Sequence, residues 1–162
     1  MSVGITIAID AMSGDEGAKI VVPAALAFLQ RQESLSDSLH KHQAFNIILV
    51  GRQDELGALL SGSENSSISV VHAETVVGMN DRPSHVLRKK QDSSMSIALG
   101  LVRDGKADAC VSAGNTGALM MLGRSILGMY PGIDRPAITK LFPSRGGGCL
   151  VLDLGANVDS SA

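Results

Sequence analysis

The sequence predicts an α/β fold, a three-layer α/β/α sandwich built around a mostly parallel sheet. Short apolar runs rich in β-branched residues alternate with helix-forming segments along most of the 162 residues. The connections between successive runs are too long for hairpins, which favours parallel strands with helices on both faces of the sheet. The length suits one domain, and we expect a single domain over residues 1–162.

The predicted strands are apolar runs that end at polar or glycine residues. They cover residues 5–9, 46–51, 68–72, 108–111 and 149–154. The predicted helices cover residues 19–32, 54–60, 94–104 and 116–127, with a short helix that starts at Pro83. Asp92 and Ser93 are suited to cap the helix over 94–104, and Gly105 is suited to end it. Residues 30–42 and 130–136 are expected to be surface connections, and 146–148 a flexible turn.

Composition excludes several classes of protein. With 14 basic and 16 acidic residues the net charge is −2, and only four residues are aromatic, so neither electrostatics nor base stacking favours a nucleic-acid partner. No apolar run approaches the roughly 20 residues of a membrane span, and the N-terminus lacks the basic start of a signal peptide. Cys110 and Cys149 lie inside apolar runs, where we expect buried free thiols. These features indicate a cytoplasmic protein.

The stretch VSAGNTGALMM, residues 111–121, is the most informative part of the sequence. It is typical of a strand that stops in a polar, glycine-flanked turn and then opens a helix. Free backbone N–H groups at a helix N-terminus favour an anion, and Gly114 and Gly117 allow a ligand to approach the backbone. The alternative, that Ser112, Asn115 and Thr116 only cap the helix, stays open.

Other polar groups near strand and helix ends have both a structural and a functional interpretation. A second strand, glycine turn and helix unit follows Asp10. The cations at residues 88–90 either form a solvated helix end or place one lysine near the anion. His72, at a strand end, is better explained as a structural histidine than as a catalytic one.

The sequence does not match either of two common nucleotide-binding motifs in full. Residues 100–107 resemble a P-loop, but the final Ser or Thr is missing and the stretch precedes a strand when it should follow one. No GxGxxG occurs, and no strand that ends in an acid lies at Asp134, 20 residues after Gly114, to hold a ribose. A nicotinamide dehydrogenase is therefore disfavoured.

Five motifs occur in order along the chain: IAIDAMSGDEG, KKQDSSMSIAL, GKADACVSAGNTGALM, GIDRPAI and LDLGANVD. In sequence, order and spacing they resemble the PlsX family of phosphate acyltransferases. The resemblance implies transfer of a fatty acyl group from acyl-acyl carrier protein to inorganic phosphate, which gives acyl phosphate for phospholipid synthesis. It also implies a fold similar to phosphotransacetylases and to isocitrate and isopropylmalate dehydrogenases. Family members are about twice as long, so the chain resembles their N-terminal half.

Ligands of such sheets bind outside the carboxyl ends of the strands, and four predicted strand ends carry polar side chains. We expect Asp10, His72, Ser112 and Asp153 to converge on one crevice. Phosphate is itself a nucleophile, so the site has to orient it against a thioester carbonyl and stabilise the developing oxyanion.

The resemblance and this chemistry together suggest site residues. As catalytic groups we expect Asp10, Asp15, Lys90, Asn115 and Asp153. As substrate-binding residues we expect Gly14, Ser93, Ser94, Ser112, Gly114, Asn115, Thr116, Gly117, Arg135 and Asn157. Lys90 or Arg135 would offset the phosphate charge, and the three aspartates would orient donors or help to protonate the leaving thiolate. No metal and no cofactor are expected.

The partners implied are acyl-acyl carrier protein, inorganic phosphate and a second copy in a homodimer, with peripheral membrane contact through the absent half. Two alternatives stay open: a phosphotransacetylase-like enzyme that uses acyl-coenzyme A, and a non-catalytic fragment. We also expect the 162-residue chain to lack acyltransferase activity by itself, because one wall of the crevice would be missing.

Overall fold

The computed structural model describes residues 4–39, 44–63 and 65–153. The chain divides into two compact units, Met1–Leu127 and Gly128–Ala162, and each is described by itself. The expectation of one domain over the whole chain stays a prediction.

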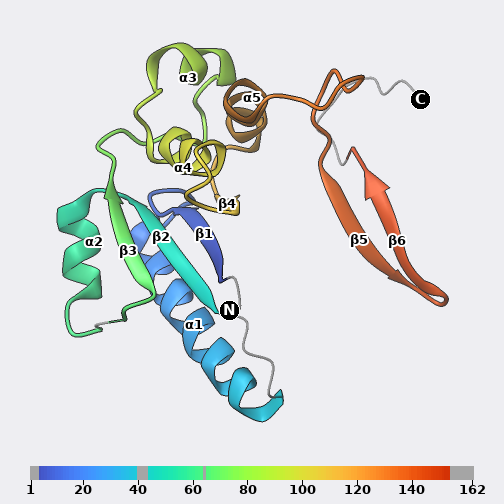
Figure 1. Cartoon of the computed structure of the whole chain (residues 1–162). Coiled ribbons are helices and arrows are strands. Elements are labelled where there is room, and N and C mark those ends of the chain that lie inside the picture. Colours follow the sequence, from blue (N-terminus) through green and yellow to red (C-terminus); the bar gives the residue numbers. More distant parts are fainter. Residues whose placement is uncertain (1–3, 40–43, 64, 154–162) are drawn as a thin grey trace. The chain divides into compact units, whose positions relative to one another are not determined.

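A four-stranded parallel sheet forms the centre of the first unit (Figure 1). Its strands are β1 (Ile5–Asp10), β2 (Phe45–Gly51), β3 (Ile68–His72) and β4 (Ala109–Val111), in the order β3-β2-β1-β4. The chain builds outwards from β1 to β3 and then returns to place β4 on the other side of β1. The direction of strand order therefore reverses between β1 and β4, the position at which parallel sheets bind ligands.

Helices cover both faces of this sheet, as the sequence predicts. On one face lie α1 (Ala18–Leu39) and α2 (Gln53–Leu60), which pack with Ile47 and Leu49 of β2. On the other face α4 (Ser94–Arg103) packs with Ala8 and Val50. Helix α5 (Thr116–Leu127) packs against α4, and α3 (Pro83–Lys89) packs against α5. Because neighbouring residues of β2 are buried on opposite faces, the strand has the continuous apolar sequence of a parallel sheet covered on both sides.

Several of the predicted helix boundaries agree with the structure, and one prediction is wrong. The helix that starts at Pro83 and the helix over 116–127 are confirmed, and Gly105, with φ +68, follows the end of α4. The expected surface connection over 30–42 is wrong in its first part, because α1 continues to Leu39. Its sequence there is polar but has no glycine or proline, so nothing in the backbone stops the helix.

The second unit contains an antiparallel hairpin of β5 (Thr139–Ser144) and β6 (Gly147–Leu152). The long connections expected between strands do not extend to this pair, and the hairpin was not predicted. Ser144 pairs with Gly147, and Gly147 has φ +133, a conformation that only glycine adopts easily and that permits the tight turn. The turn predicted at residues 146–148 is confirmed only in its first residue, because the turn covers residues 145–146 and β6 begins at Gly147. The last strand pairs with β5 in a separate sheet.

The two cysteines differ in their surroundings. Both are free thiols, but only Cys110 is half-buried, and Cys149 is exposed on the hairpin. Burial raises the pKa of the Cys110 thiol to about 12, so that thiol stays protonated at neutral pH. The expectation of a buried thiol is wrong for Cys149, because both strands of the hairpin are largely exposed.

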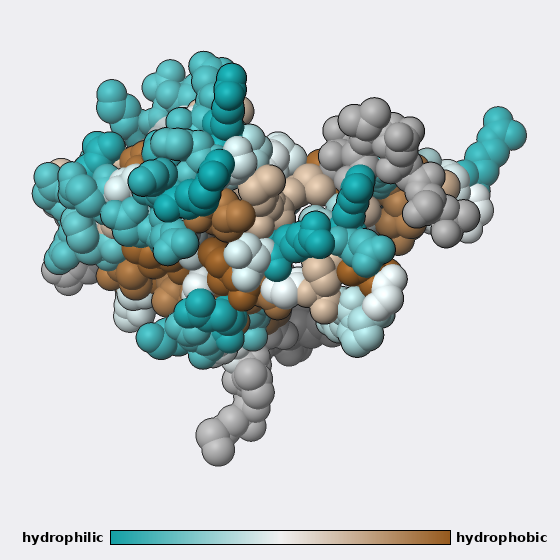
Figure 2. Space-filling view, turned by 90° about the horizontal axis from the view of Figure 1, so that it is seen from above, coloured by the Kyte–Doolittle hydropathy of each residue, from teal (hydrophilic) through white to brown (hydrophobic). Residues whose placement is uncertain are grey.

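Hydrophobic side chains also reach the surface. On the hairpin these are Leu141, Phe142, Leu150 and Leu152. Figure 2 shows hydrophilic residues over much of the face seen from above, with hydrophobic residues exposed between them. Within the described ranges, no helix is long and apolar enough to span a membrane.

Candidate functional site

The carboxyl ends of β1 and β4 meet in one hydrogen bond. Ser112 Oγ donates to Asp10 Oδ2 at 2.8 Å, and Gly114 N donates to Ser112 Oγ at 3.2 Å. Asp10 is 2% exposed. A buried carboxylate at the end of β1 therefore fixes a hydroxyl at the end of β4, and that hydroxyl fixes the turn that leads into α5.

A second bridge joins the same two loops. Ser13 Oγ donates to the Asp10 backbone oxygen at 2.7 Å and accepts from Ala113 N at 3.0 Å. Gly14 has φ +83, and a Cβ placed there would be 3.5 Å from the Ala113 Cβ. The loop after β1 and the loop after β4 thus lie side by side, as the sequence predicted for the strand ends at Asp10 and Ser112.

The start of α5 keeps three backbone N–H groups available. Ala113 N and Gly114 N are already bonded to serine hydroxyls, and Ala118 N donates to Asn115 Oδ1 at 3.0 Å. Among the described residues, by contrast, no hydrogen bond involves the N–H groups of residues 115–117. Thr116 and Gly117 are exposed. These consecutive donors at a helix N-terminus form an arrangement suited to an anion.

The Asn115 side chain is already engaged. Its Oδ1 caps α5, and its Nδ2 donates to the backbone oxygens of Gly78, Met79 and Asp81 at 3.3, 3.0 and 2.9 Å. The sequence left open whether Asn115 caps the helix or binds an anion. The cap is now observed, and in this arrangement the amide hydrogens face carbonyl oxygens.

Lys90 follows α3 and forms an ion pair. Its Nζ lies 2.6 Å from Asp81 Oδ2 and donates to the Val76 backbone oxygen at 2.7 Å. The side chains of Lys90 and Asp81 are 23% and 27% exposed. Lys90 holds the pKa of the Asp81 carboxyl below its ordinary value. The lysine charge is therefore balanced locally, whereas Arg88 and Lys89 are exposed.

The start of α4 adds buried hydroxyls beside Asp10. Ser93 caps this helix by accepting from Ser96 N at 3.3 Å, which confirms the predicted cap. Burial raises the pKa of the Asp10 carboxyl, and the hydroxyls of Ser94 and Ser112 oppose that rise. Neither Asp10 Oδ1 nor Ser94 Oγ meets hydrogen-bond geometry with a described residue, so Ser94 influences Asp10 as a near neighbour.

The other predicted site residues fall at several places along the chain. Asp15 follows Gly14 but is exposed. His72 is exposed at the end of β3, where Gln53 N donates to its Nδ1 at 3.4 Å, in keeping with a structural histidine. Asp153, with φ +58, and Arg135 belong to the second unit, and Asn157 lies outside the described residues. Convergence of Asp153 with the other strand ends thus stays a prediction.

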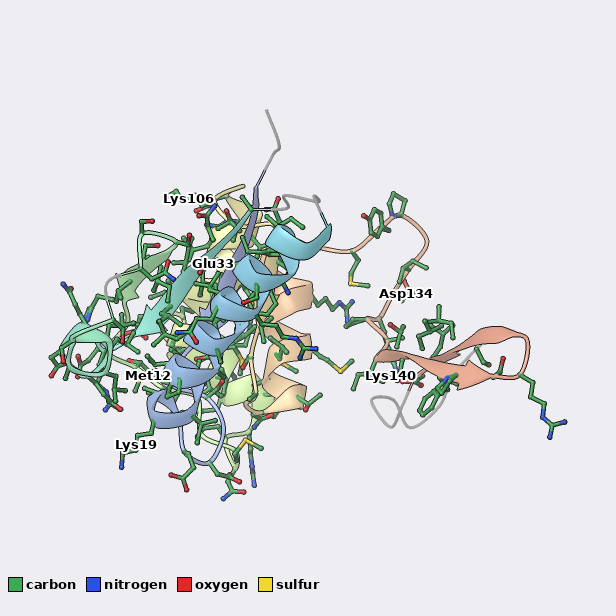
Figure 3. All side chains as sticks on the ribbon, turned by 90° about the horizontal axis from the view of Figure 1, so that it is seen from below. Met12, Lys19, Glu33, Lys106, Asp134 and Lys140 are labelled. Atoms are coloured by element: carbon green, nitrogen blue, oxygen red, sulfur yellow. The ribbon has the colours of Figure 1, made fainter. Side chains whose placement is uncertain are left out.

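The opposite end of the sheet holds the stretch that resembles a P-loop. Figure 3 shows Met12 and Lys19 together near the start of α1, with Lys106 at the other end of this unit. Lys106 precedes β4, so it lies at the amino ends of the parallel strands. This position is consistent with the conclusion that residues 100–107 do not form a P-loop.

Ser13 and Asp81 were missed by the sequence analysis. Ser13 lies within the IAIDAMSGDEG motif, and its hydroxyl bonds to the backbone oxygen of Asp10. Serine hydroxyls commonly stabilise turns in this way. No sequence pattern around Asp81 indicates its role, because that role depends on contacts with Lys90 and Asn115 elsewhere in the chain.

The family described as "Fatty acid synthesis protein" matches the chain over residues 5–162. The chain belongs to this family.

Its relatives carry the name phosphate acyltransferase, which confirms the resemblance found in the sequence. The protein of Marinobacter nauticus is 60% identical over 158 residues, which cover 98% of this chain and 43% of that protein. The protein of Pseudomonas putida is 54% identical over 159 residues, 96% of this chain and 44% of that protein. The protein of Legionella pneumophila is 50% identical over 161 residues, which cover 98% of this chain and 44% of that protein. The chain spans less than half the length of these relatives.

Proposed function

We propose that this chain supplies the phosphate-binding part of a phosphate acyltransferase, which moves a fatty acyl group from acyl-acyl carrier protein to inorganic phosphate. The observation that carries the proposal is the row of available N–H groups at residues 115–117, at the point where strand order reverses. The name of the relatives supports the choice of phosphate as the anion and of an acyl group as the other reactant.

In this reaction a phosphate oxygen attacks the thioester carbonyl carbon and the carbon–sulfur bond breaks. Hydrogen phosphate carries the proton that the leaving thiolate needs, so the products are acyl phosphate and a thiol without any other reactant. The N–H groups of Thr116 and Gly117 would orient the phosphate and balance part of its charge.

Asp10 is better suited to orientation than to contact with the substrate. It is buried, and its Oδ2 accepts from Ser112, so it holds the turn before α5 in place. Lys90 would act on the phosphate only if its ion pair with Asp81 opened. Asp15 is the exposed carboxyl beside Gly14, and it is the aspartate of this loop that could relay a proton to the thiolate.

The partners and location form part of the same proposal. Acyl-acyl carrier protein as donor, a homodimer, a cytoplasmic location and peripheral membrane contact follow from the family resemblance. A comparison of acyl-acyl carrier protein with acyl-coenzyme A as donor, in a full-length version of the protein, separates the proposed activity from a phosphotransacetylase-like one.

A single backbone N–H can be removed to test the phosphate site. Thr116 is the first residue of α5, where proline is tolerated because its N–H has no partner within the helix. Thr116→Pro in a full-length version should raise the KM for phosphate at least about tenfold, equivalent to about 1.4 kcal/mol, because a hydrogen bond to a charged group contributes roughly 1.5–3 kcal/mol. Thr116→Ala removes the hydroxyl but keeps the N–H, and its KM should stay close to that of the wild type.

The two variants together decide the role of the backbone. Thermal unfolding of both should match, because proline fits the first helical position. Equal KM values for phosphate in the two variants would show that this N–H does not contact the substrate. Absence of phosphate-dependent thiol release from the wild type would contradict the proposed function as a whole.

A further inference from the structure

A short turn at residues 78–81, here the 78–81 turn, presents three carbonyl oxygens to one amide group. These belong to Gly78, Met79 and Asp81, and all three accept from Asn115 Nδ2 at 2.9 to 3.3 Å. The amide has two hydrogens, so at least one is shared between two oxygens. Three carbonyl dipoles that point at one place repel one another, and the turn therefore needs other contacts to keep this shape.

Asp81 supplies those contacts. Its Oδ2 accepts from Gly78 N at 2.8 Å, which closes the turn, and from Lys90 Nζ at 2.6 Å, which ties the turn to the end of α3. The Asp81 N–H also donates to the Gly78 oxygen at 3.1 Å. One carboxylate oxygen thus joins the two ends of the turn to a cation.

The 78–81 turn acts on the residue that opens α5. Asn115 precedes Thr116 and caps the helix through Oδ1, while its Nδ2 is held by the turn. The side-chain amide cannot rotate without losing both sets of bonds. The orientation of the peptide groups at residues 115–117 is therefore linked to Asp81 through the Asn115 side chain.

We propose that Asp81 is a positioning residue for phosphate: it shapes the 78–81 turn, which holds Asn115 and so preorganises the N–H groups at the start of α5. This inference rests on the proposed function, since it concerns the same anion. Asp81 itself does not contact the substrate; a carboxylate beside a phosphate would repel it, and its charge is balanced by Lys90.

A merely structural ion pair predicts a different outcome from a positioning role. Partly exposed ion pairs contribute little to stability, so loss of the Asp81 charge should leave thermal unfolding almost unchanged. Affinity depends instead on the fraction of molecules in which the N–H groups are correctly oriented. If that fraction falls to about one-tenth, the apparent Kd for phosphate rises about tenfold.

The test uses Asp81→Asn in a full-length version, with Asp104→Asn as the matched control. Asp104 pairs with Arg103 at 2.8 Å on the exposed end of α4, away from the 78–81 turn. Two experiments are made on each variant. Hydrogen–deuterium exchange is followed in peptides that cover residues 76–82 and 112–118, and steady-state kinetics give the KM and kcat for phosphate. Asp81→Asn should accelerate exchange in both peptides and raise the KM for phosphate about tenfold, with a smaller change in kcat. Asp104→Asn should change neither.

Each outcome decides a separate point. Unchanged exchange in the 112–118 peptide would overturn the link between Asp81 and α5. Accelerated exchange with an unchanged KM would overturn the positioning role, although the turn would still depend on Asp81. A wild type that does not use phosphate would overturn the proposed function, and exchange would then still report whether Asp81 orders the start of α5.

Discussion

Ser112 Oγ donates a 2.8 Å hydrogen bond to Asp10 Oδ2, which joins two residues 102 positions apart at the ends of β1 and β4. The bond crosses the place where strand order reverses, so the residues that shape the candidate site also fix the packing of two neighbouring strands. Stability and site geometry should therefore be affected by the same substitutions.

Ser112→Ala should destabilise the fold. It leaves the buried Asp10 carboxylate without this donor and Gly114 N without its acceptor, and one unsatisfied buried group costs about 1–3 kcal/mol. Ser61→Ala is the matched control, because the Ser61 hydroxyl bonds to the Ala58 oxygen on the surface. Urea unfolding measures both variants, and equal midpoints would contradict the role given to Ser112.

Asp10→Asn should change the pH dependence of stability. Burial raises the folded-state pKa of Asp10 above its ordinary value of 3.8. The folded state thus binds the proton more tightly than the unfolded state, and this contribution favours folding at low pH and is lost as pH rises through the folded-state pKa. Asparagine does not titrate and can still accept from Ser112.

The free energy of unfolding of wild type and Asp10→Asn, measured from pH 4 upwards, provides the test. The stability of the variant relative to the wild type should rise with pH and then level off above the folded-state pKa. Two curves that stay parallel over this range would show that the Asp10 pKa is the same in the folded and unfolded states.

The two roles of Asn115, as a helix cap and as a contact of the 78–81 turn, can be separated by comparing its alanine and serine variants. Serine caps a helix about as well as asparagine but has no amide to reach the 78–81 turn. Asn115→Ala should therefore be about 1 kcal/mol less stable than Asn115→Ser, while both should lose phosphate affinity to a similar degree. Wild-type KM for phosphate in Asn115→Ser would show that the turn does not influence the start of α5.

Gly114→Ala should be harmful, whereas Gly57→Ala should be beneficial. A Cβ at Gly114 would lie 3.1 Å from Ser13 Cβ, 3.2 Å from Met95 Cε and 3.3 Å from Ser112 Oγ, and such overpacking typically costs about 1–3 kcal/mol. Gly57 lies in α2 with nothing within 4 Å of an added Cβ, so alanine should stabilise the helix by about 0.5–1 kcal/mol. Thermal unfolding should shift in opposite directions, and a stable Gly114→Ala would show that the loops can separate.

The elements that carry the candidate site were predictable because the relevant signals are local. The strand, turn and helix pattern at residues 108–127 predicted where β4 ends and where α5 begins, and Ser93 was recognised as a cap. The hairpin was not predicted, since an apolar run such as CLVLDL fits a buried parallel strand as well as an exposed antiparallel one.

The sequence by itself determined the alternation of strands and helices, the family, and the glycine-flanked turn before α5, because each depends on residues close together along the chain. Only the tertiary structure decided which N–H groups of that turn are available. Ser13 and Ser112 occupy two of them, Asn115 occupies a third, and Asp81 neutralises Lys90. The Ser13 bond joins residues 100 positions apart. The bonds of Ser112 and Asn115 to the turn are local, but Asp10 and the 78–81 turn, which hold these two side chains, are distant in sequence. Hydrogen bonds and ion pairs depend on distance in space, which the order of residues does not specify until the sheet has brought its strand ends together.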